Sequence, residues 1–179
     1  MLLDQLNLNT FMDYLGSVIT SDWKKIPSTN IVPVDPQTFP EVIRISRQVF
    51  QTTSESLFFR YSKIFNYIFY IAKKDSKVVG YCVYHIKPII SIKGIKKEAI
   101  LYSIAIDNYY QNEGFGKKLL TISIQEMKIN KISNIILFTN KKNFSANSLY
   151  LKCGFEIIKE MENICGIGEK CFMMSLKLL

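Results

Sequence analysis

A glycine-containing turn between a strand and a helix is the first feature of this sequence that could carry chemistry. Gly114 and Gly116 follow an apolar run that ends at Asp107, and a long helix-forming stretch begins directly after them. Glycine has no Cβ, so a ligand can approach the backbone, and the free N–H groups of a helix N-terminus favour an anion. The turn therefore predicts a phosphate site, although it lacks the endings of a P-loop or a dinucleotide fingerprint. A tight turn with close helix packing explains the same residues without a ligand.

The rest of the chain predicts the elements that must position this turn. Strands are expected at 31–34, 67–73, 77–86, 98–107, 135–139, 155–161 and 171–178, and helices at 36–50, from 54, at 114–130 and at 145–152. Pro33 cannot donate to a ladder, which predicts that the first strand lies at a sheet edge. Asp35 and Pro36 are expected to cap and begin the first of these helices. This order of elements predicts an α/β domain with a mixed sheet.

The first thirty residues are expected to form an accessory helical segment, separate from a main domain at 31–179. Thr10 and Asp13 have the spacing of a capping box. The apolar residues Phe11, Met12, Leu15, Val18 and Ile19 then fall on one face of a helix. A short amphipathic helix of this kind is expected to pack on its own domain.

Composition and charge exclude several classes of function. A chain of 179 residues suits one domain, and its 23 basic and 15 acidic side chains give a net charge of +8. The longest apolar stretches, 64–72 and 78–86, are too short to span a membrane. Asp4 and Asp13 do not fit a secretory signal, so a cytoplasmic protein is expected. The lysines are scattered, which argues against a nucleic-acid partner and suits a small molecule that carries phosphate.

The four cysteines (Cys82, Cys153, Cys165 and Cys171) are expected to be reduced thiols in a reducing compartment. The sequence contains no CxxC pair and only one histidine, His85, so no metal site is expected. Cys82 and His85 resemble a nucleophile and its base. However, residues three apart on a strand point to opposite faces, so we reject that pair.

Two motifs in register resemble the GNAT superfamily of acyl-CoA N-acyltransferases. Gln111-x-x-Gly114-x-Gly116 after an apolar strand is similar to the Arg/Gln-x-x-Gly-x-Gly/Ala motif of that superfamily. The second motif is Asn143-x-x-Ala146-x-x-Leu149-Tyr150-x-x-x-Gly154-Phe155. The resemblance covers residues 31–179 and implies the GNAT fold, a central mixed sheet of about six to seven strands that splays at its middle. It also implies direct transfer of an acetyl group from acetyl-CoA to a primary amine.

The resemblance assigns roles to individual residues. The pyrophosphate of acetyl-CoA would bind the backbone of Gln111, Asn112, Glu113, Gly114, Phe115, Gly116 and Lys117. The pantetheine arm would lie between strands 98–107 and 135–140 and bond to the backbone of Ile104, Ala105 and Ile106. Asn143 matches a position that contacts the cofactor. Tyr150 matches the acid that protonates the CoA thiolate, and a phenol with a pKa near 10 carries its proton at neutral pH.

The chain also departs from the family pattern near the acceptor. Glu113 replaces a commonly basic residue, and Phe138 stands where ribosomal-protein alanine N-acetyltransferases place a glutamate base. An α-amine with a pKa near 7.8 is partly neutral at pH 7.5, whereas a lysine near 10.4 is almost wholly charged. A site without a strong base is thus expected to prefer α-amines or amino sugars. Glu98, Tyr102 or an ordered water remain as the base.

Three functions remain open. The segment 166–174 is similar to the last hairpin of peptide N-terminal acetyltransferases, which favours a peptide or protein α-amine by a small margin. Asn163 and Ile164 stand in place of the paired tyrosines that grip peptides in those enzymes. Glucosamine 6-phosphate is the alternative acceptor, and enzymes acting on it usually build the sugar site across a homodimer. A catalytically weak acyl-CoA-binding module is the third.

Overall fold

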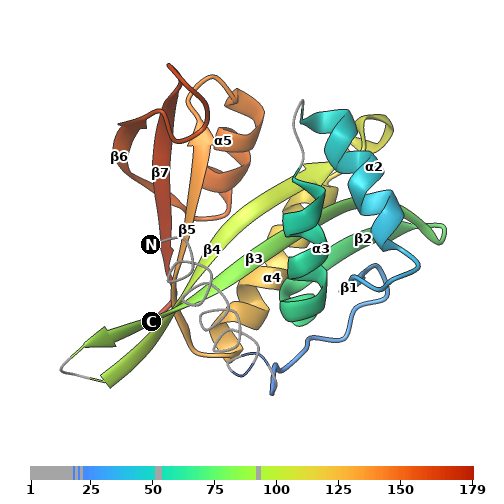
Figure 1. Cartoon of the computed structure of the whole chain (residues 1–179), viewed down its shortest axis with the longest axis horizontal. Helices are drawn as coiled ribbons and strands as arrows, with labels where there is room; N and C mark the ends of the chain where they lie inside the picture. Colours follow the sequence, from blue (N-terminus) through green and yellow to red (C-terminus); the bar gives the residue numbers. More distant parts are fainter. Residues whose placement is uncertain (1–17, 19, 21, 51–53, 92–93) are drawn as a thin grey trace.

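The computed structural model describes residues 18, 20, 22–50, 54–91 and 94–179 (Figure 1). The elements follow the chain as β1 (Ile31–Pro33), α2 (Phe39–Val49), α3 (Glu55–Ile64), the 3-10 helix η1 (Asn66–Ile68), β2 (Phe69–Lys74), β3 (Lys77–Ser91), β4 (Gly94–Ile106), the 3-10 helix η2 (Asn108–Tyr110), α4 (Phe115–Ile129), β5 (Ile132–Asn140), α5 (Phe144–Lys152), β6 (Glu156–Glu162) and β7 (Lys170–Lys177). The predicted order of strands and helices is confirmed. None of the described helices is long and apolar enough to cross a membrane.

The seven strands form one mixed sheet in the order β1-β2-β3-β4-β5-β7-β6. Only β4 and β5 run parallel, and all other neighbours are antiparallel. Helices α2 and α3 cover one face of the β1–β4 part, and α4 covers the opposite face (Figure 1). The strand β1 with Pro33 lies at a sheet edge, as its missing donor predicted. In Figure 1 the strands β4 and β5 diverge, so that the sheet opens between its two parts.

Three predicted boundaries differ clearly from the structure. The helix expected from Pro36 begins at Phe39, because the carboxylate of Asp35 accepts from the N–H groups of Gln37 and Thr38 and holds residues 35–38 in a turn. The strands expected to end at 86 and to begin at 98 continue to Ser91 and from Gly94. Pairing between β3 and β4 continues past Lys87 and Pro88 to Ser91 opposite Gly94, which extends the hairpin.

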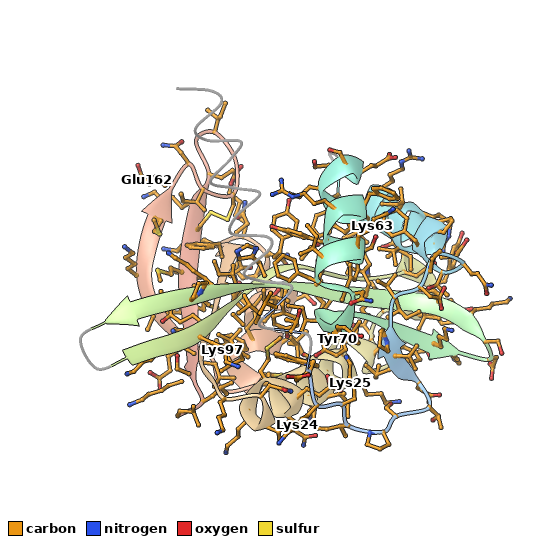
Figure 2. All side chains as sticks on the ribbon, turned by 60° about the horizontal axis from the view of Figure 1, so that its bottom comes forward. Lys24, Lys25, Lys63, Tyr70, Lys97 and Glu162 are labelled. Carbon is orange, nitrogen blue, oxygen red and sulfur yellow. A yellow bond between two sulfur atoms is a disulfide. The ribbon has the colours of Figure 1, made fainter. Side chains whose placement is uncertain are left out.

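The segment 22–30 is held against α4 by the buried carboxylate of Glu126 and by Asn130, whose side chain bonds both backbone groups of Lys24. The Glu126 carboxylate accepts from the indole Nε1 of Trp23 at 3.1 Å, the hydroxyl of Tyr70 at 2.8 Å and the N–H of Ile26 at 3.0 Å. The ammonium of Lys25 lies 3.1 Å from the same carboxylate and 4.3 Å above the Tyr70 ring (Figure 2). Burial lowers the pKa of Lys25 despite this partner. The predicted helix that starts at Thr10 falls on residues outside the described part, apart from Val18 and Thr20.

Candidate active site

The β4–β5 ladder stops halfway along the two strands. Register pairs run from Lys97 with Ile132 to Leu101 with Leu137, and no later pair joins the strands among the described residues. At the same level the β3–β4 register shifts, with Val83 opposite Ser103 and Tyr84 opposite Leu101. Tyr102 is therefore the extra residue of a β-bulge, which bends β4 away from β5. The predicted splay of the sheet begins at this bulge.

Beyond the bulge, one edge of β4 faces the space between β4 and β5, which we call the gap. The N–H of Asp107 donates to the carbonyl of Val79 at 2.9 Å, and backbone groups alternate between the two edges of an antiparallel strand. The N–H and C=O groups of Ile104 and Ile106 consequently point away from β3 and toward β5. Ala105 points its own backbone groups to β3, so of the three predicted residues only Ile104 and Ile106 offer hydrogen bonds to the gap.

An ion pair between the buried Asp107 and the exposed Arg44 supports the turn that follows β4. Asp107 is 3% exposed, and its carboxylate accepts from the N–H of Tyr109 at 3.0 Å and from the guanidinium of Arg44 on α2 at 2.7 Å. Burial by itself raises the pKa of Asp107, but these hydrogen bonds and the Arg44 charge outweigh it and hold the pKa below its ordinary value. The sequence analysis missed both residues. The one signal in the sequence was the acidic residue Asp107 itself, which stands between an apolar strand and the glycine turn.

The backbone of the turn presents unpaired donors. Asn112 and Gly114 adopt left-handed conformations with φ of 64° and 83°, and the Gln111 side chain donates to Asn108 Oδ1 at 2.9 Å and to the Ile106 carbonyl at 3.3 Å. No side chain caps α4 at Gly114, so the N–H groups of its first turn stay available. Phe115 is buried, while Lys117 is exposed. This arrangement suits the oxygens of a phosphate.

Gly116 lies where α4 approaches α5. A Cβ at this position would stand 3.1 Å from Leu149 Cδ2 of α5 and 3.8 Å from Ile106 Cγ1 of β4. Gly80 on β3 lies even closer to β4 than Gly116 does. A Cβ at Gly80 would overlap Ile106 Cδ1 and stand 2.9 Å from the Ala105 carbonyl. Gly80 therefore leaves room for the Ile106 side chain, and Gly116 leaves room for Leu149 of α5. The sequence analysis identified only Gly116.

Tyr150 and Asn143 lie on the second predicted motif. Tyr150 is 6% exposed, and its ring packs edge-on against Phe155. Burial raises the pKa of Tyr150, which keeps the phenol protonated. Asn143 caps α5, with its side-chain oxygen accepting from the N–H of Ala146 at 3.2 Å.

The two proposed base residues occupy different positions on one face of β4. Tyr102 lies at the splay, 42% exposed, and its ring stacks edge-on against Tyr61 and Phe58 of α3 at 5.2 and 6.1 Å. Burial raises the pKa of Tyr102, which opposes its use as a base. Glu98 pairs in register with Lys87 and Asn134, within the closed part of the ladder. Glu98 therefore lies before the splay rather than at it.

Phe138 lies on β5 one residue past the last β4–β5 pair and is 39% exposed. A phenylalanine has no carboxylate, so residue 138 cannot act as the base at the opening of the sheet. Cys82 and His85 lie on opposite faces of β3, as expected: Tyr84, on the other side of the strand from His85 and two residues from Cys82, bonds Ser123 on α4, and the His85 ring contacts Phe65 after α3. Within the described residues, no group of three His, Cys, Asp or Glu side chains could hold a metal ion.

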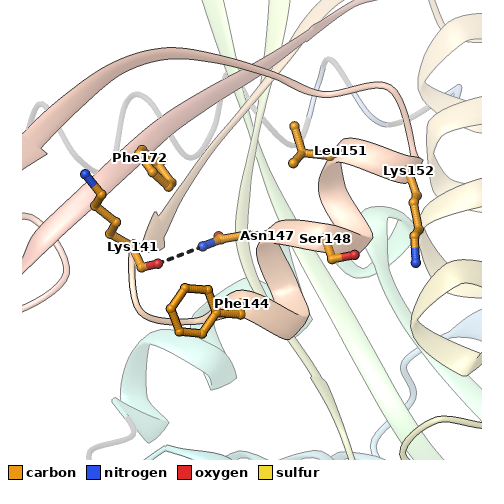
Figure 3. Close-up of a pocket in the computed structure, with 7 residues that line it drawn as sticks. All are labelled: Lys141, Phe144, Asn147, Ser148, Leu151, Lys152 and Phe172. Carbon is orange, nitrogen blue, oxygen red and sulfur yellow. Dashed lines mark hydrogen bonds between the residues drawn. The ribbon is translucent and has the colours of Figure 1, made fainter.

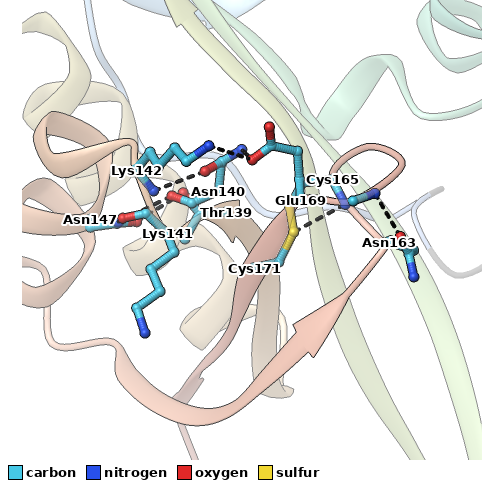
Figure 4. The surroundings of a disulfide bond; sticks show 10 residues. Thr139, Asn140, Lys141, Lys142, Asn147, Asn163, Cys165, Glu169 and Cys171 are labelled. Carbon is cyan, nitrogen blue, oxygen red and sulfur yellow. Dashed lines mark hydrogen bonds and ion pairs between the residues drawn. A yellow bond between two sulfur atoms is a disulfide. The ribbon is translucent and has the colours of Figure 1, made fainter.

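The expectation of four free thiols is wrong, because Cys165 and Cys171 form a disulfide (Figure 4). The β6–β7 turn brings their Cα atoms to 6.1 Å, within the range that a disulfide spans. Spacing along the sequence did not reveal this approach. The same turn is held by Asn163, which accepts from the N–H of Gly168 at 2.7 Å, and by Glu169, which accepts from Asn140 at 3.0 Å.

A shallow apolar depression lies on a different side of α5. Its volume is about 470 Å³, and it is lined by Lys141, Phe144, Asn147, Ser148, Leu151, Lys152 and Phe172 (Figure 3). Leu149, on the side of α5 that meets Gly116, does not line it. The depression contains none of the predicted site residues, so it is separate from the opening between β4 and β5.

Comparisons with known proteins agree with this geometry. The chain matches the Acetyltransferase (GNAT) family over residues 37–155. It is 27% identical to the N-alpha-acetyltransferase of Sulfolobus acidocaldarius over 166 residues, which cover 89% of this chain and 99% of that protein. The ribosomal-protein-S18-alanine N-acetyltransferase from Escherichia coli has a similar structure (TM-score 0.67, 22% identity, 83% of this chain and 92% of that chain). So does a chain of the NatC complex bound to Gag peptide and CoA (TM-score 0.74, 22% identity, 84% and 100%).

Proposed function

Since this chain belongs to the GNAT family of acetyltransferases and is an N-acetyltransferase, we propose that it acetylates the α-amine of a peptide or protein N-terminus. Enzymes of this family use acetyl-CoA and an amine. The observation that carries the finer proposal is Phe138 at the splay. Without a carboxylate there, the site suits an amine that is already largely neutral near pH 7.5, as an α-amine is. The relatives named N-alpha-acetyltransferase support the same acceptor.

The residues of the opening fit the coenzyme. The uncapped N–H groups of Phe115, Gly116 and Lys117 would bind its pyrophosphate, and the edge of β4 at Ile104 and Ile106 would bond its pantetheine arm. When bound, acetyl-CoA supplies the acetyl group as a thioester. The turn itself is formed by Gln111, Asn112, Glu113 and Gly114. The side-chain NH2 group of Asn143, whose oxygen caps α5, would contact the coenzyme.

Each step at the reacting carbonyl is assigned to a residue of the chain. The N–H of Ile106 faces the gap and would donate to the negative charge that develops on the acyl oxygen, which is worth roughly 3 kcal/mol per donor. Tyr150 holds a proton at its hydroxyl and would donate it to the leaving sulfur. An ordered water is the best candidate for the base, since Tyr102 holds its proton tightly and Glu98 lies before the splay.

A thiol-release assay across amines tests this proposal. The acceptors are a short peptide with a free α-amine, the same peptide with a blocked α-amine and a free lysine, glucosamine 6-phosphate and spermidine. Turnover on the first peptide alone is expected. Turnover confined to glucosamine 6-phosphate would replace the proposal with the amino-sugar alternative, to which the +8 charge also lends support.

Two variants serve as controls. Gly116→Glu places charge and bulk between the turn and Leu149, so it is expected to abolish coenzyme binding. Thermal melting shows whether this variant is folded. Tyr150→Phe keeps the ring and removes the proton donor. If the native chain binds acetyl-CoA tightly but turns over no amine, it is the acyl-CoA-binding module instead.

A further inference from the structure

An ion pair joins the phosphate turn to a distant hairpin. Lys74, the last residue of β2, places its Nζ 2.6 Å from a carboxylate oxygen of Glu113, which directly precedes Gly114. The same Nζ lies 5.4 Å from the centre of the Tyr110 ring in η2. The β2–β3 hairpin therefore places the ammonium of Lys74 beside the turn, although 39 residues separate the two partners in the sequence.

The ion pair offsets the unfavourable negative charge of Glu113 in the turn. A carboxylate beside the uncapped start of α4 opposes the binding of a phosphate there. The ammonium of Lys74 neutralises this carboxylate and raises the local potential. Lys74 and Glu113 are 41% and 40% exposed, and an exposed ion pair is weak. Lys74 can thus exchange the carboxylate for a stronger anion at little cost, and a lysine is a common phosphate ligand.

We propose that Lys74 is a phosphate-binding residue of the coenzyme site, held at the turn by Glu113 until a phosphate of CoA takes the place of that carboxylate. This inference rests on the proposed acetyl-CoA site and names a residue from outside its two motifs. In the chain without CoA, Glu113 holds the Lys74 side chain at the turn, and its carboxylate competes with the phosphate of CoA for the ammonium. Either the pyrophosphate or the 3′-phosphate could supply the anion, and the two are separable by experiment.

Calorimetric titration of the full chain with CoA at low salt tests this inference. Lys74→Met keeps much of the side-chain length and removes the charge. Lys77→Met is the matched control, because Lys77 lies directly across the hairpin from Lys74, is exposed and makes the same change in net charge. We expect Lys74→Met to weaken CoA binding about tenfold, the loss of one charge-assisted hydrogen bond, and Lys77→Met to change it less than twofold.

The Glu113→Gln variant separates binding from support of the turn. If Lys74 binds phosphate, Lys74→Met weakens CoA binding in the Glu113→Gln background as it does in the native chain. If Lys74 only neutralises Glu113 or stabilises the turn through the ion pair, Lys74→Met has no effect in that background, and the inference is overturned. Equal losses in Lys74→Met and Lys77→Met would also overturn it, because they would indicate a diffuse charge effect.

Titration with 3′-dephospho-CoA identifies the phosphate. A loss in Lys74→Met that persists with this probe assigns Lys74 to the pyrophosphate, and a loss that vanishes assigns it to the 3′-phosphate. Each result supports the inference in a different form. Failure of the native chain to bind CoA at all would instead contradict the proposed function, so the two failures are distinguishable.

Discussion

The guanidinium of Arg44 lies 2.7 Å from the buried carboxylate of Asp107, and this contact joins α2 to the end of β4. Asp107 also caps η2, so the pair determines how the chain leaves the site strand and enters the glycine turn. An ion pair between α2 and the end of β4 therefore supports the turn at which the ligand is expected to bind.

Removing this pair is expected to lower both stability and coenzyme affinity. Arg44→Ala leaves a buried carboxylate without its cation, and we expect a loss of about 2 kcal/mol in the free energy of unfolding. Glu41→Gln is the control, since it removes the exposed partner of the same guanidinium and should cost under about 0.5 kcal/mol. Urea denaturation measures both. Equal effects would show that the bond to Asp107 adds nothing.

The same carboxylate predicts a dependence on pH. The pKa of Asp107 is below its ordinary value of about 3.9, so its stabilising effect is complete above that value and is lost as the pH falls through the lower folded pKa. The stability difference between the native chain and Asp107→Asn should accordingly shrink below about pH 4. A constant difference from pH 6 to pH 2 would contradict the assignment.

Tyr150→Phe is expected to reduce turnover by tenfold or more and to leave the Kd for acetyl-CoA within twofold. The variant retains the ring that packs on Phe155. Because burial raises the pKa of Tyr150, its deprotonation should not reduce the rate of the native enzyme below about pH 10. Steady-state kinetics against pH measures both effects. Unchanged turnover in the variant would remove Tyr150 as the acid.

The buried Glu126 is expected to hold the segment around Trp23. Trp23 is the single tryptophan of the chain and is 7% exposed, so its fluorescence reports the docking of this segment. Glu126→Ala leaves the donors of Trp23 and Tyr70 unsatisfied, and a red shift of the emission with a loss of about 2 kcal/mol is expected. The exposed Glu162 provides the control, Glu162→Ala, which should leave the spectrum unchanged.

Thiol counting tests the disulfide. In denaturant without reductant, two thiols should react with a chromogenic disulfide reagent, those of Cys82 and Cys153. After reduction, four should react. Cys165→Ser should expose a third thiol without reductant, that of Cys171. Four reactive thiols in the unreduced native chain would restore the expectation from sequence.

Local patterns were sufficient to predict most of the fold. The two strands that flank Asp75 and Ser76, the edge position of Pro33 and the helix predicted over 145–152 each depend on the conformations of a few adjacent residues. The boundary errors have a local cause as well. Asp35 caps a turn rather than a helix, a difference that only the hydrogen bonds of its carboxylate reveal. The roles of the predicted site residues stay predictions, which the variants above test.

The sequence by itself determined the family, the order of the elements and the glycine turn, since these follow from residue types at short and regular spacings. Only the tertiary structure decided which distant side chains meet that turn and its approach from β4, and which cysteines pair. Arg44 reaches Asp107 across 63 residues, Lys74 reaches Glu113 across 39, and Cys165 approaches Cys171 because a hairpin folds back. Such contacts depend on how elements pack against one another, and no spacing along the chain encodes the distance between two packed elements.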